Sequence, residues 1–241
     1  MIVKIESRQN DKIKDVVKLY QSSERNKRKE FLVEGFHLFE MALHSNVVKS
    51  IFVLKEIKDI PQNIIQYIVT PEIMEKISSV KTPQGIVSLC SMKEEKEITS
   101  NRVLYLDDIS DPGNMGTLLR TALAFGYKDV IVSNGCCSVY NEKVLLASQG
   151  AIFDLNISTD RDNILSILKG YSIYATEIKG SKNLNEIKAS CKHVLVLGNE
   201  AHGVSEKILS LASERIRIDI KDIESLNVAV AGGIAMYHLS K

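Results

Sequence analysis

Several features that define specialised classes of protein are scarce or missing in this sequence of 241 residues. With 13 glycines and 4 prolines, the composition excludes collagen-like and low-complexity chains. The four cysteines show no Cys-x-x-Cys spacing, which argues against a zinc site or a disulfide framework and favours a reducing, cytoplasmic location. No run of about 18 apolar residues occurs, and the first residues lack the apolar core of a signal peptide, so we expect neither a membrane span nor a membrane partner.

Charge of one sign is also lacking overall, because 31 basic residues face 30 acidic ones. The protein is therefore not a polycation of the histone type. One local exception is a basic cluster, which is either a solvated helix end or a surface that neutralises RNA phosphates. Its members are Arg25, Lys27, Arg28 and Lys29.

A polar stretch of mixed charge at residues 91–97 separates two regions with apolar patterning, which predicts two domains, residues 1–95 and 96–241. The first region is a small α/β domain of about ninety residues by its apolar spacing. Its predicted helices lie at 13–20, 36–43 and from 71, and its predicted strands at 31–34, 47–54 and 64–69.

The second region alternates strand and helix patterns regularly, which is typical of a parallel sheet covered by helices on both faces. In this architecture the ligand site lies at the carboxyl ends of the strands. The predicted strands are 102–106, 129–132, 172–175, 193–197 and 216–220, and the predicted helices 115–125, 142–148, 164–168, 206–211 and 228–239.

Three segments follow or border predicted strands at that edge. In the first, residues 106–122, Asn114 can cap a helix and Arg120 lies in an otherwise apolar helix, where a guanidinium needs an anionic partner or a polar cleft. A structural ion pair from Arg120 to Asp107 or Asp108 explains this position as well as a functional role does.

The second segment is Leu-Gly-Asn-Glu-Ala-His-Gly at 197–203. Gly198 permits a close backbone approach to a ligand, and Glu200 is either catalytic or simply a favoured residue at a helix start. His202 is better explained as a surface or capping residue than as a base. The spacing is not a dinucleotide fingerprint, and the chain contains no Gly-Lys-Ser or Gly-Lys-Thr phosphate loop.

The third segment, residues 218–235, ends in a helix with unusually small side chains, which Ser225 or Asn227 can cap. Gly232 and Gly233 each cost about 1 kcal/mol relative to alanine in a helix, so we expect a closely packed partner to compensate, and we place that partner across a dimer interface.

Taken together, the three segments resemble the three ordered motifs of the SpoU/TrmH family of RNA ribose 2′-O-methyltransferases, in the SPOUT superfamily. They read N-x-G-x-x-x-R-T-A-x-x-x-G from Asn114, L-G-N-E-x-x-G from Leu197 and E-S-L-N-V-A-V-A from Glu224. The resemblance covers residues 100–241, and the first domain is similar to the substrate-binding domain that precedes the catalytic domain in many members.

This resemblance implies an α/β fold whose carboxyl-terminal part is tied in a deep trefoil knot, a homodimer with active sites completed by the partner, and S-adenosylmethionine as cofactor. It also implies that the cofactor is held mainly through backbone groups, and the positions that match are Leu197, Gly198, Ile218, Leu226 and Asn227. Catalytic positions by the same comparison are Asn114, Arg120, Glu200, Ser225 and Asn227, and no metal is implied.

The family arginine is often described as activating the hydroxyl. Because a guanidinium stays protonated, we expect Arg120 to hold a phosphate and stabilise developing alkoxide charge instead. The sequence departs from the family pattern at Asp219, where proline is frequent, and at Ala201-His202, which affects the expected loop shape and cofactor affinity.

The implied partner is a folded RNA, ribosomal rather than transfer RNA, gripped in part by the basic cluster. Three alternatives remain open from the sequence: a tRNA methyltransferase, a non-catalytic RNA-binding or assembly factor that keeps the fold, and a nucleotide-dependent oxidoreductase, which the missing fingerprint disfavours.

Overall fold

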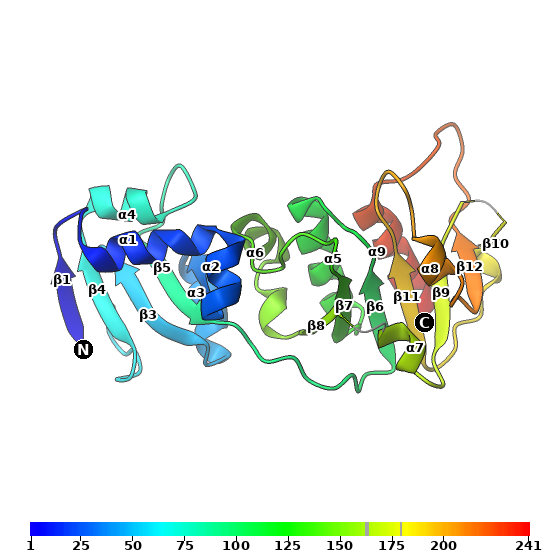
Figure 1. The fold of residues 1–241 in the computed structure, drawn as a ribbon, viewed down its shortest axis with the longest axis horizontal. Coiled ribbons are helices and arrows are strands. Elements are labelled where there is room, and N and C mark those ends of the chain that lie inside the picture. Colours follow the sequence, from blue (N-terminus) through cyan, green and yellow to red (C-terminus); the bar gives the residue numbers. More distant parts are fainter. Residues whose placement is uncertain (162–163, 179) are drawn as a thin grey trace. The chain divides into compact units, whose positions relative to one another are not determined.

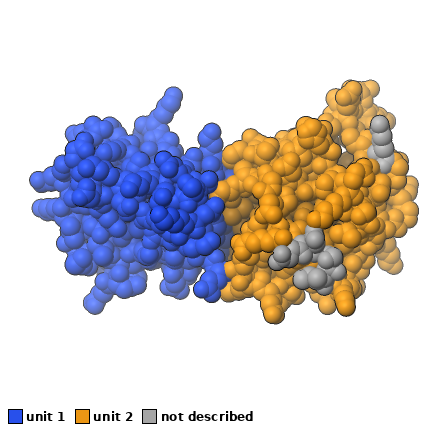
Figure 2. All heavy atoms as spheres, viewed as in Figure 1, with its two compact units in different colours: residues 1–94, 140–153 blue, residues 95–139, 154–241 orange. Residues whose placement is uncertain are grey.

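The computed structural model describes residues 1–161, 164–178 and 180–241. They form two compact units, residues 1–94 with 140–153 and residues 95–139 with 154–241 (Figure 2). Each unit has its own sheet (Figure 1). Each also has its own apolar core. Among the described residues no helix is long and apolar enough to cross a membrane.

Unit 1 is built on a five-stranded mixed sheet of order β1-β4-β3-β5-β2. The strands β1, β4 and β3 run parallel, and β5 lies antiparallel between β3 and β2. The strands are β1 (Ile2–Ile5), β2 (Glu30–Glu34), β3 (Val48–Val53), β4 (Ile65–Val69) and β5 (Ile86–Ser91). The helices are α1 (Asp11–Val17), α2 (Ser22–Arg28), α3 (Phe36–His44), α4 (Pro71–Ile77) and α6 (Glu142–Ser148), with 3₁₀ turns at Lys18–Tyr20 and Ala151–Phe153.

The core of unit 1 forms because apolar residues of α1 and α4 recur at helical spacing and meet alternate residues of the strands. Ile13 and Ile73 are fully buried there against Phe52. The expected small α/β domain is thus present, with β1 and β5 as strands that the apolar pattern did not indicate.

The segment 140–153, which the sequence assigns to the second domain, packs with unit 1. The ring of Phe31 in β2 lies 4.7 Å from that of Tyr140 and 6.4 Å from that of Phe153. Leu145 of α6 lines a recess together with Leu32. Apolar contacts therefore tie this stretch to the first unit although its neighbours in sequence belong to the second.

Unit 2 contains an all-parallel sheet of seven strands in the order β10-β12-β9-β11-β6-β7-β8. The strands are β6 (Arg102–Leu106), β7 (Asp129–Ser133), β8 (Asn156–Asp160), β9 (Ser172–Thr176), β10 (Lys182–Asn183), β11 (His193–Leu197) and β12 (Glu214–Arg217). The helices are α5 (Pro112–Ala124), α7 (Ile164–Ile167), α8 (Glu206–Leu209) and α9 (Val228–Leu239), with a 3₁₀ turn at Leu184–Glu186.

Helices cover both faces of this sheet, as the sequence predicts. Leu165 of α7 and Ile208 of α8 pack with Val103 and Val194, whereas α5 and α9 pack on the opposite face, where Leu118 and Leu197 meet at Gly232. From β6 the chain adds β7 and β8 on one side and later places β11 on the other. The carboxyl ends of β6 and β11 therefore border the point where the strand order reverses. The trefoil knot stays a prediction.

Candidate active site

The segment after β6 leads into α5 through a capped turn. Asp111 is the N-cap of α5, its Oδ1 accepts a 2.7 Å hydrogen bond from the backbone N–H of Asn114, and Pro112 occupies the first turn. The prediction that Asn114 caps this helix is wrong, because the N-cap is Asp111 and the helix begins at Pro112, three residues before the predicted start. The side chain of Asn114 is thereby left available for other contacts.

Those contacts join the three sequence motifs. Asn227, the N-cap of α9, accepts hydrogen bonds at its Oδ1 from the backbone N–H groups of Ala229 (2.9 Å) and Val230 (3.3 Å). Its Nδ2 must then point the other way, and it donates to Asn114 Oδ1 at 2.9 Å. Asn114 Nδ2 in turn donates to Glu200 Oε1 at 2.7 Å.

This chain of three side chains, Asn227–Asn114–Glu200, is called the amide relay below. Its direction is fixed at one end by the backbone of α9, which can only donate, and at the other by a carboxylate, which can only accept. Glu200 is exposed and Asn114 half-buried, so the relay faces solvent and can meet a ligand.

The loop after β11 is a tight turn closed by the chain itself. Asn199 and Gly203 exchange two backbone hydrogen bonds of 3.0 and 2.9 Å, and Gly203 has φ +70°. A Cβ at Gly198 would collide with the backbone of Gly203 and Val204. The close approach predicted for Gly198 is therefore made by the protein's own backbone, which fixes the position of Glu200.

The glycines of α9 have their packing partner within the chain. A Cβ at Gly232 would lie 2.6 Å from both Leu118 of α5 and Leu197 of β11, whereas one at Gly233 would meet only Thr121 at 3.7 Å. The expected tight approach is thus intramolecular at Gly232, and it brings α9 and its cap Asn227 next to α5.

Arg120 is exposed, and among the described residues it makes no hydrogen bond with the amide relay. Within the described ranges it has no ion-pair partner, so the structural pair with Asp107 or Asp108 is ruled out. Asp107 instead accepts from Ser205 N at 2.8 Å, and the Asp108 carbonyl accepts from Asn199 Nδ2 at 2.8 Å. Ser225 is exposed, and among the described residues it makes no hydrogen bond with the relay.

The residues expected to hold the cofactor lie at the same edge of the sheet. Leu197 ends β11 and Gly198 follows it, and both are buried. Ile218 follows β12 and Leu226 precedes Asn227, and both are half-buried. In the described part of the chain, no backbone N–H of residues 219–226 donates a hydrogen bond within the protein. A loop with free backbone groups fits a cofactor that is recognised mainly through the main chain.

The loop of Cys136 and Cys137, whose spacing argues against both a zinc site and a disulfide framework, also borders the site. Cys137 N donates to the Ile109 carbonyl at 2.9 Å, and the Cys136 thiol lies 3.3 Å from the Leu106 carbonyl at the end of β6. Burial, with smaller contributions from Cys136 and Asp111, raises the pKa of the Cys137 thiol to about 11. Cys137 is therefore a neutral side chain at physiological pH.

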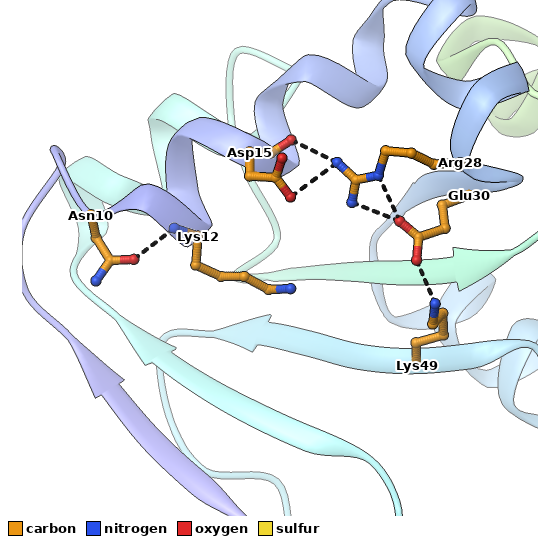
Figure 3. A network of polar contacts seen from close by, with 6 residues as sticks. All are labelled: Asn10, Lys12, Asp15, Arg28, Glu30 and Lys49. Carbon is orange, nitrogen blue, oxygen red and sulfur yellow. Dashed lines mark hydrogen bonds and ion pairs between the residues drawn. The ribbon is translucent and has the colours of Figure 1, made fainter.

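In unit 1 the structure corrects the basic cluster. Arg25 is 3% exposed and donates to the carbonyls of Leu19 and Tyr20 at 3.0 and 2.8 Å, so it closes the turn before α2 and is not accessible to a phosphate. Arg28 pairs with Asp15 at 3.0 Å and with Glu30 at 2.6 Å (Figure 3).

Glu30 is shared further, since Lys49 also contacts it at 2.5 Å (Figure 3). These hydrogen bonds and charges lower the pKa of Glu30 and keep it ionised, against the opposing effect of its burial. Arg28 is thus committed to a structural network. Of the predicted cluster only Lys27 and Lys29 are exposed.

Comparison with known proteins agrees with this geometry. The SpoU rRNA Methylase family matches residues 101–237, which contain all three motifs, and the MRM3-like substrate binding domain matches residues 10–88. The chain belongs to the SpoU rRNA methylase family. As a member it is an S-adenosylmethionine-dependent RNA methyltransferase that acts on ribose 2′-hydroxyls, as its motifs lead us to expect.

The proteins that this SpoU methylase resembles include two rRNA methyltransferases and one tRNA modifying enzyme. It is 37% identical to the 23S rRNA (guanosine(2553)-2′-O)-methyltransferase RlmP of Bacillus subtilis, with 98% of each chain covered. The AdoMet-bound rRNA methyltransferase from Sinorhizobium meliloti shares its fold with a TM-score of 0.88 at 24% identity, covering 99% of this chain and 97% of that one. The A. aeolicus TrmH/SpoU tRNA modifying enzyme has a TM-score of 0.53 at 28% identity, covering 59% of this chain and 75% of that one.

Proposed function

We propose that this SpoU methylase modifies a ribose of large-subunit ribosomal RNA. The relative from B. subtilis, which matches along the full length of both chains, carries that activity in its name and supports ribosomal over transfer RNA. The observation that carries the catalytic part is the amide relay, which brings Asn114, Glu200 and Asn227 of three separate motifs into one hydrogen-bonded chain.

In this proposal S-adenosylmethionine supplies the methyl group to the ribose 2′-oxygen, whose proton is lost to solvent or a nearby acceptor, and S-adenosylhomocysteine leaves. Leu197, Gly198, Ile218, Leu226 and the Asn227 main chain hold the cofactor.

The exposed guanidinium of Arg120 binds the phosphate next to the target ribose and stabilises the developing negative charge on the 2′-oxygen. The amide relay fixes the positions of the three motifs relative to one another at the edge of the site. Ser225 and Glu200 line the space that the ribose occupies.

The proposal includes a homodimer. Val230, Ile234 and Tyr237 are spaced along one face of α9 and are 52%, 42% and 54% exposed, and we call them the α9 stripe. Tyr237 continues the stripe toward α5, since its ring lies 5.7 Å from that of Phe125. A second copy that covers the stripe would also approach the exposed face of α5 that carries Arg120.

The deciding experiment is transfer of a tritiated methyl group to separate preparations of 23S rRNA, 16S rRNA and tRNA from a strain that lacks the enzyme, followed by mapping of the labelled ribose. Label on a 23S ribose is the expected result, and the cytoplasm, where this RNA is assembled, is the proposed location. Label on tRNA alone would favour the tRNA alternative, and cofactor binding without transfer to any RNA would favour the assembly factor.

A further inference from the structure

Unit 1 exposes an aromatic side chain where three neighbouring strands come to an end. The strands β3, β5 and β2 are adjacent, with Val53 opposite Ile86 and Glu34 opposite Val87. The residues just beyond these pairs are Phe36 after β2, Leu54 after β3 and Gln84 before β5. Phe36 is 45% and Leu54 38% exposed, although both are large apolar residues.

Direct contacts join Phe36 to Gln84 and Leu54 to Gly85, the neighbour of Gln84, and the surface formed by Phe36, Leu54 and Gln84 is called the Phe36 patch below. The Gln84 carboxamide lies over Gly35, so that a Cβ there would come within 2.9 Å of Gln84 Oε1, and the same oxygen accepts a 3.4 Å hydrogen bond from Phe36 N. Leu54 covers Gly85 in the same way, at 3.2 Å, and its N–H donates to the Gly85 carbonyl. Gly35 and Gly85 both have φ +88°, a conformation that side chains disfavour.

The loop that carries Gln84 is held in place from the other side. Glu34 accepts hydrogen bonds from the hydroxyls of Ser78 and Ser79 and from Ser79 N, at 2.5, 2.5 and 2.7 Å. Tyr20, whose pKa is raised by burial and then by Glu34, stays neutral with its hydroxyl 2.9 Å from the same carboxylate. These bonds anchor the start of the loop that carries Gln84, which reduces the entropy cost of binding at this loop.

The charges beside the patch indicate which class of ligand it binds. Lys55 follows Leu54 and Lys81 precedes Gln84 in the same loop; both are exposed, and neither has an ion-pair partner among the residues that the structure describes. An exposed aromatic face with an amide beside it and unpaired cations at its margin suits an unstacked nucleobase with its phosphates. The cluster at Arg25 and Arg28 lacks this combination, because its arginines are committed to the fold.

We propose that the Phe36 patch is the RNA-binding surface of unit 1, where an unpaired base of the substrate RNA stacks on Phe36 and its backbone meets Lys55 and Lys81. The inference rests on the proposed function in taking ribosomal RNA as the ligand. Phe36 is a binding residue and takes no part in methyl transfer.

The test is ultraviolet crosslinking of the full chain to 23S rRNA transcribed in vitro, without a methyl donor. Trypsin releases residues 30–49 as one peptide, and its other phenylalanines, Phe31 and Phe39, are only 2% and 5% exposed. We expect the crosslinked nucleotide on Phe36. Crosslinks confined to other peptides would overturn the assignment, whatever the behaviour of any variant.

Equilibrium binding to the same RNA gives the second measurement. Phe36→Ala is expected to weaken binding roughly tenfold, Phe36→Leu nearly as much, since leucine has no flat face, and Phe36→Tyr less than about twofold. The matched control is Ile2→Ala, because Ile2 is 46% exposed on β1 at the opposite edge of the sheet, and it is expected to change nothing.

Full RNA affinity in Phe36→Leu would exclude stacking of a base on Phe36. Full RNA affinity in Phe36→Ala would exclude RNA as the ligand of the patch and would favour a protein partner instead. The outcome is separable from that of the proposed function. Methyl transfer to 23S rRNA with unchanged affinity in Phe36→Ala refutes the patch alone, whereas a Phe36 crosslink without methyl transfer to any RNA refutes the enzyme proposal alone.

Discussion

Polar side chains at the two edges of the seven-stranded sheet differ in their burial and in their hydrogen-bond partners. At the carboxyl edge, Asn114, Glu200 and Asn227 bond mainly to one another and reach solvent. At the amino edge, His193 at the start of β11 is 1% exposed and fully bonded within the chain. Its Nδ1 lies 2.8 Å from the Ser190 carbonyl, so this nitrogen carries the hydrogen, and Nε2 accepts from the Tyr127 hydroxyl at 2.8 Å.

Arg102 shows the same closure at the amino edge. Its Nη1 donates to the Phe125 carbonyl at 3.3 Å and its Nη2 to the Ser240 carbonyl at 2.7 Å, so one guanidinium binds the carboxyl ends of both α5 and α9. A cation there also complements both helix dipoles. The difference between the edges teaches that groups buried and bonded inside the fold support stability, whereas groups that bond to one another at the surface remain available to a ligand.

The largest effect that separates the edges is expected at Arg120. Arg120→Ala should lower kcat/KM by about 100- to 1000-fold, because a donor to developing charge is lost, while the melting temperature changes little for an exposed residue. Arg120→Lys should recover only part of the loss, since an ammonium cannot form the paired contacts of a guanidinium. Near wild-type turnover in the lysine variant would exclude the planar, bidentate role.

The α9 stripe gives the next largest effect. Ile234→Glu places a charge in the centre of the proposed dimer contact, and light scattering after gel filtration should show a monomer with methyl transfer reduced by at least about tenfold. Lys207→Glu, an exposed change on α8 on the other face of the sheet, is the control. An Ile234→Glu protein that remains dimeric and active would exclude the stripe as the interface.

At the amino edge the effect should fall on stability alone. Arg102→Met removes both helix-end contacts and is expected to lower the free energy of unfolding by roughly 2–3 kcal/mol, measured by urea denaturation, with kcat unchanged at a temperature where the variant is folded. The contrasting variant is Asn114→Ala at the opposite edge, which should lose most of its activity while its free energy of unfolding changes little. If Arg102→Met lost activity without stability, the division between the edges would be wrong.

His193 predicts a pH dependence of the same kind. Burial lowers its pKa below the usual value of about 6.5, so below that pH the unfolded chain binds a proton that the folded chain rejects. Stability is therefore complete above about pH 6.5 and declines as the pH falls through this region, by at most about 1.4 kcal/mol per pH unit. Urea denaturation of wild type and His193→Gln between pH 5 and 8 should show a shallower decline in the variant, and parallel curves would contradict the assignment.

The smallest effect belongs to the remaining cations of the predicted cluster. Lys27→Gln with Lys29→Gln should weaken binding to 23S rRNA only a few-fold and slightly flatten its salt dependence, less than Phe36→Ala affects affinity. Lys4→Gln on β1 serves as the control. If the double variant lost more RNA affinity than Phe36→Ala, the main RNA contact of unit 1 would have to be assigned to the end of α2 instead of the Phe36 patch.

The sequence predicted most of the elements of unit 2 because its buried strands and helices are long apolar runs. β6, β11 and α9 have the predicted bounds, whereas β8 was missed because Asn156–Asp160 contains one apolar residue and forms an edge strand. The strand predicted at 216–220 lies at Glu214–Arg217, since its pairing with β9 ends at Ile216. Periodicity records burial and is weak wherever a strand is only half covered.

The sequence indicated which residues make up the candidate site, but it did not indicate the hydrogen bonds that connect them. The rule that ligands bind at the carboxyl ends of parallel strands placed the three motifs at one edge, but the N-cap role of Asp111 and the hydrogen bonds of the relay depend on side-chain directions that no spacing encodes. Arg25 and Arg28 were misassigned for the same reason. Their partners include backbone carbonyls and the carboxylates of Asp15 and Glu30, which a count of charges cannot reveal.

The fixed direction of the amide relay restricts how this enzyme can be redesigned. Replacing Asn114 with the isosteric aspartate would set two oxygens against each other at Glu200. Replacing Asn227 with alanine would remove both its donor to Asn114 and the cap of the first turn of α9. A change at one of the three positions therefore alters the hydrogen bonds of its neighbours, and a redesign of this edge has to vary all three together.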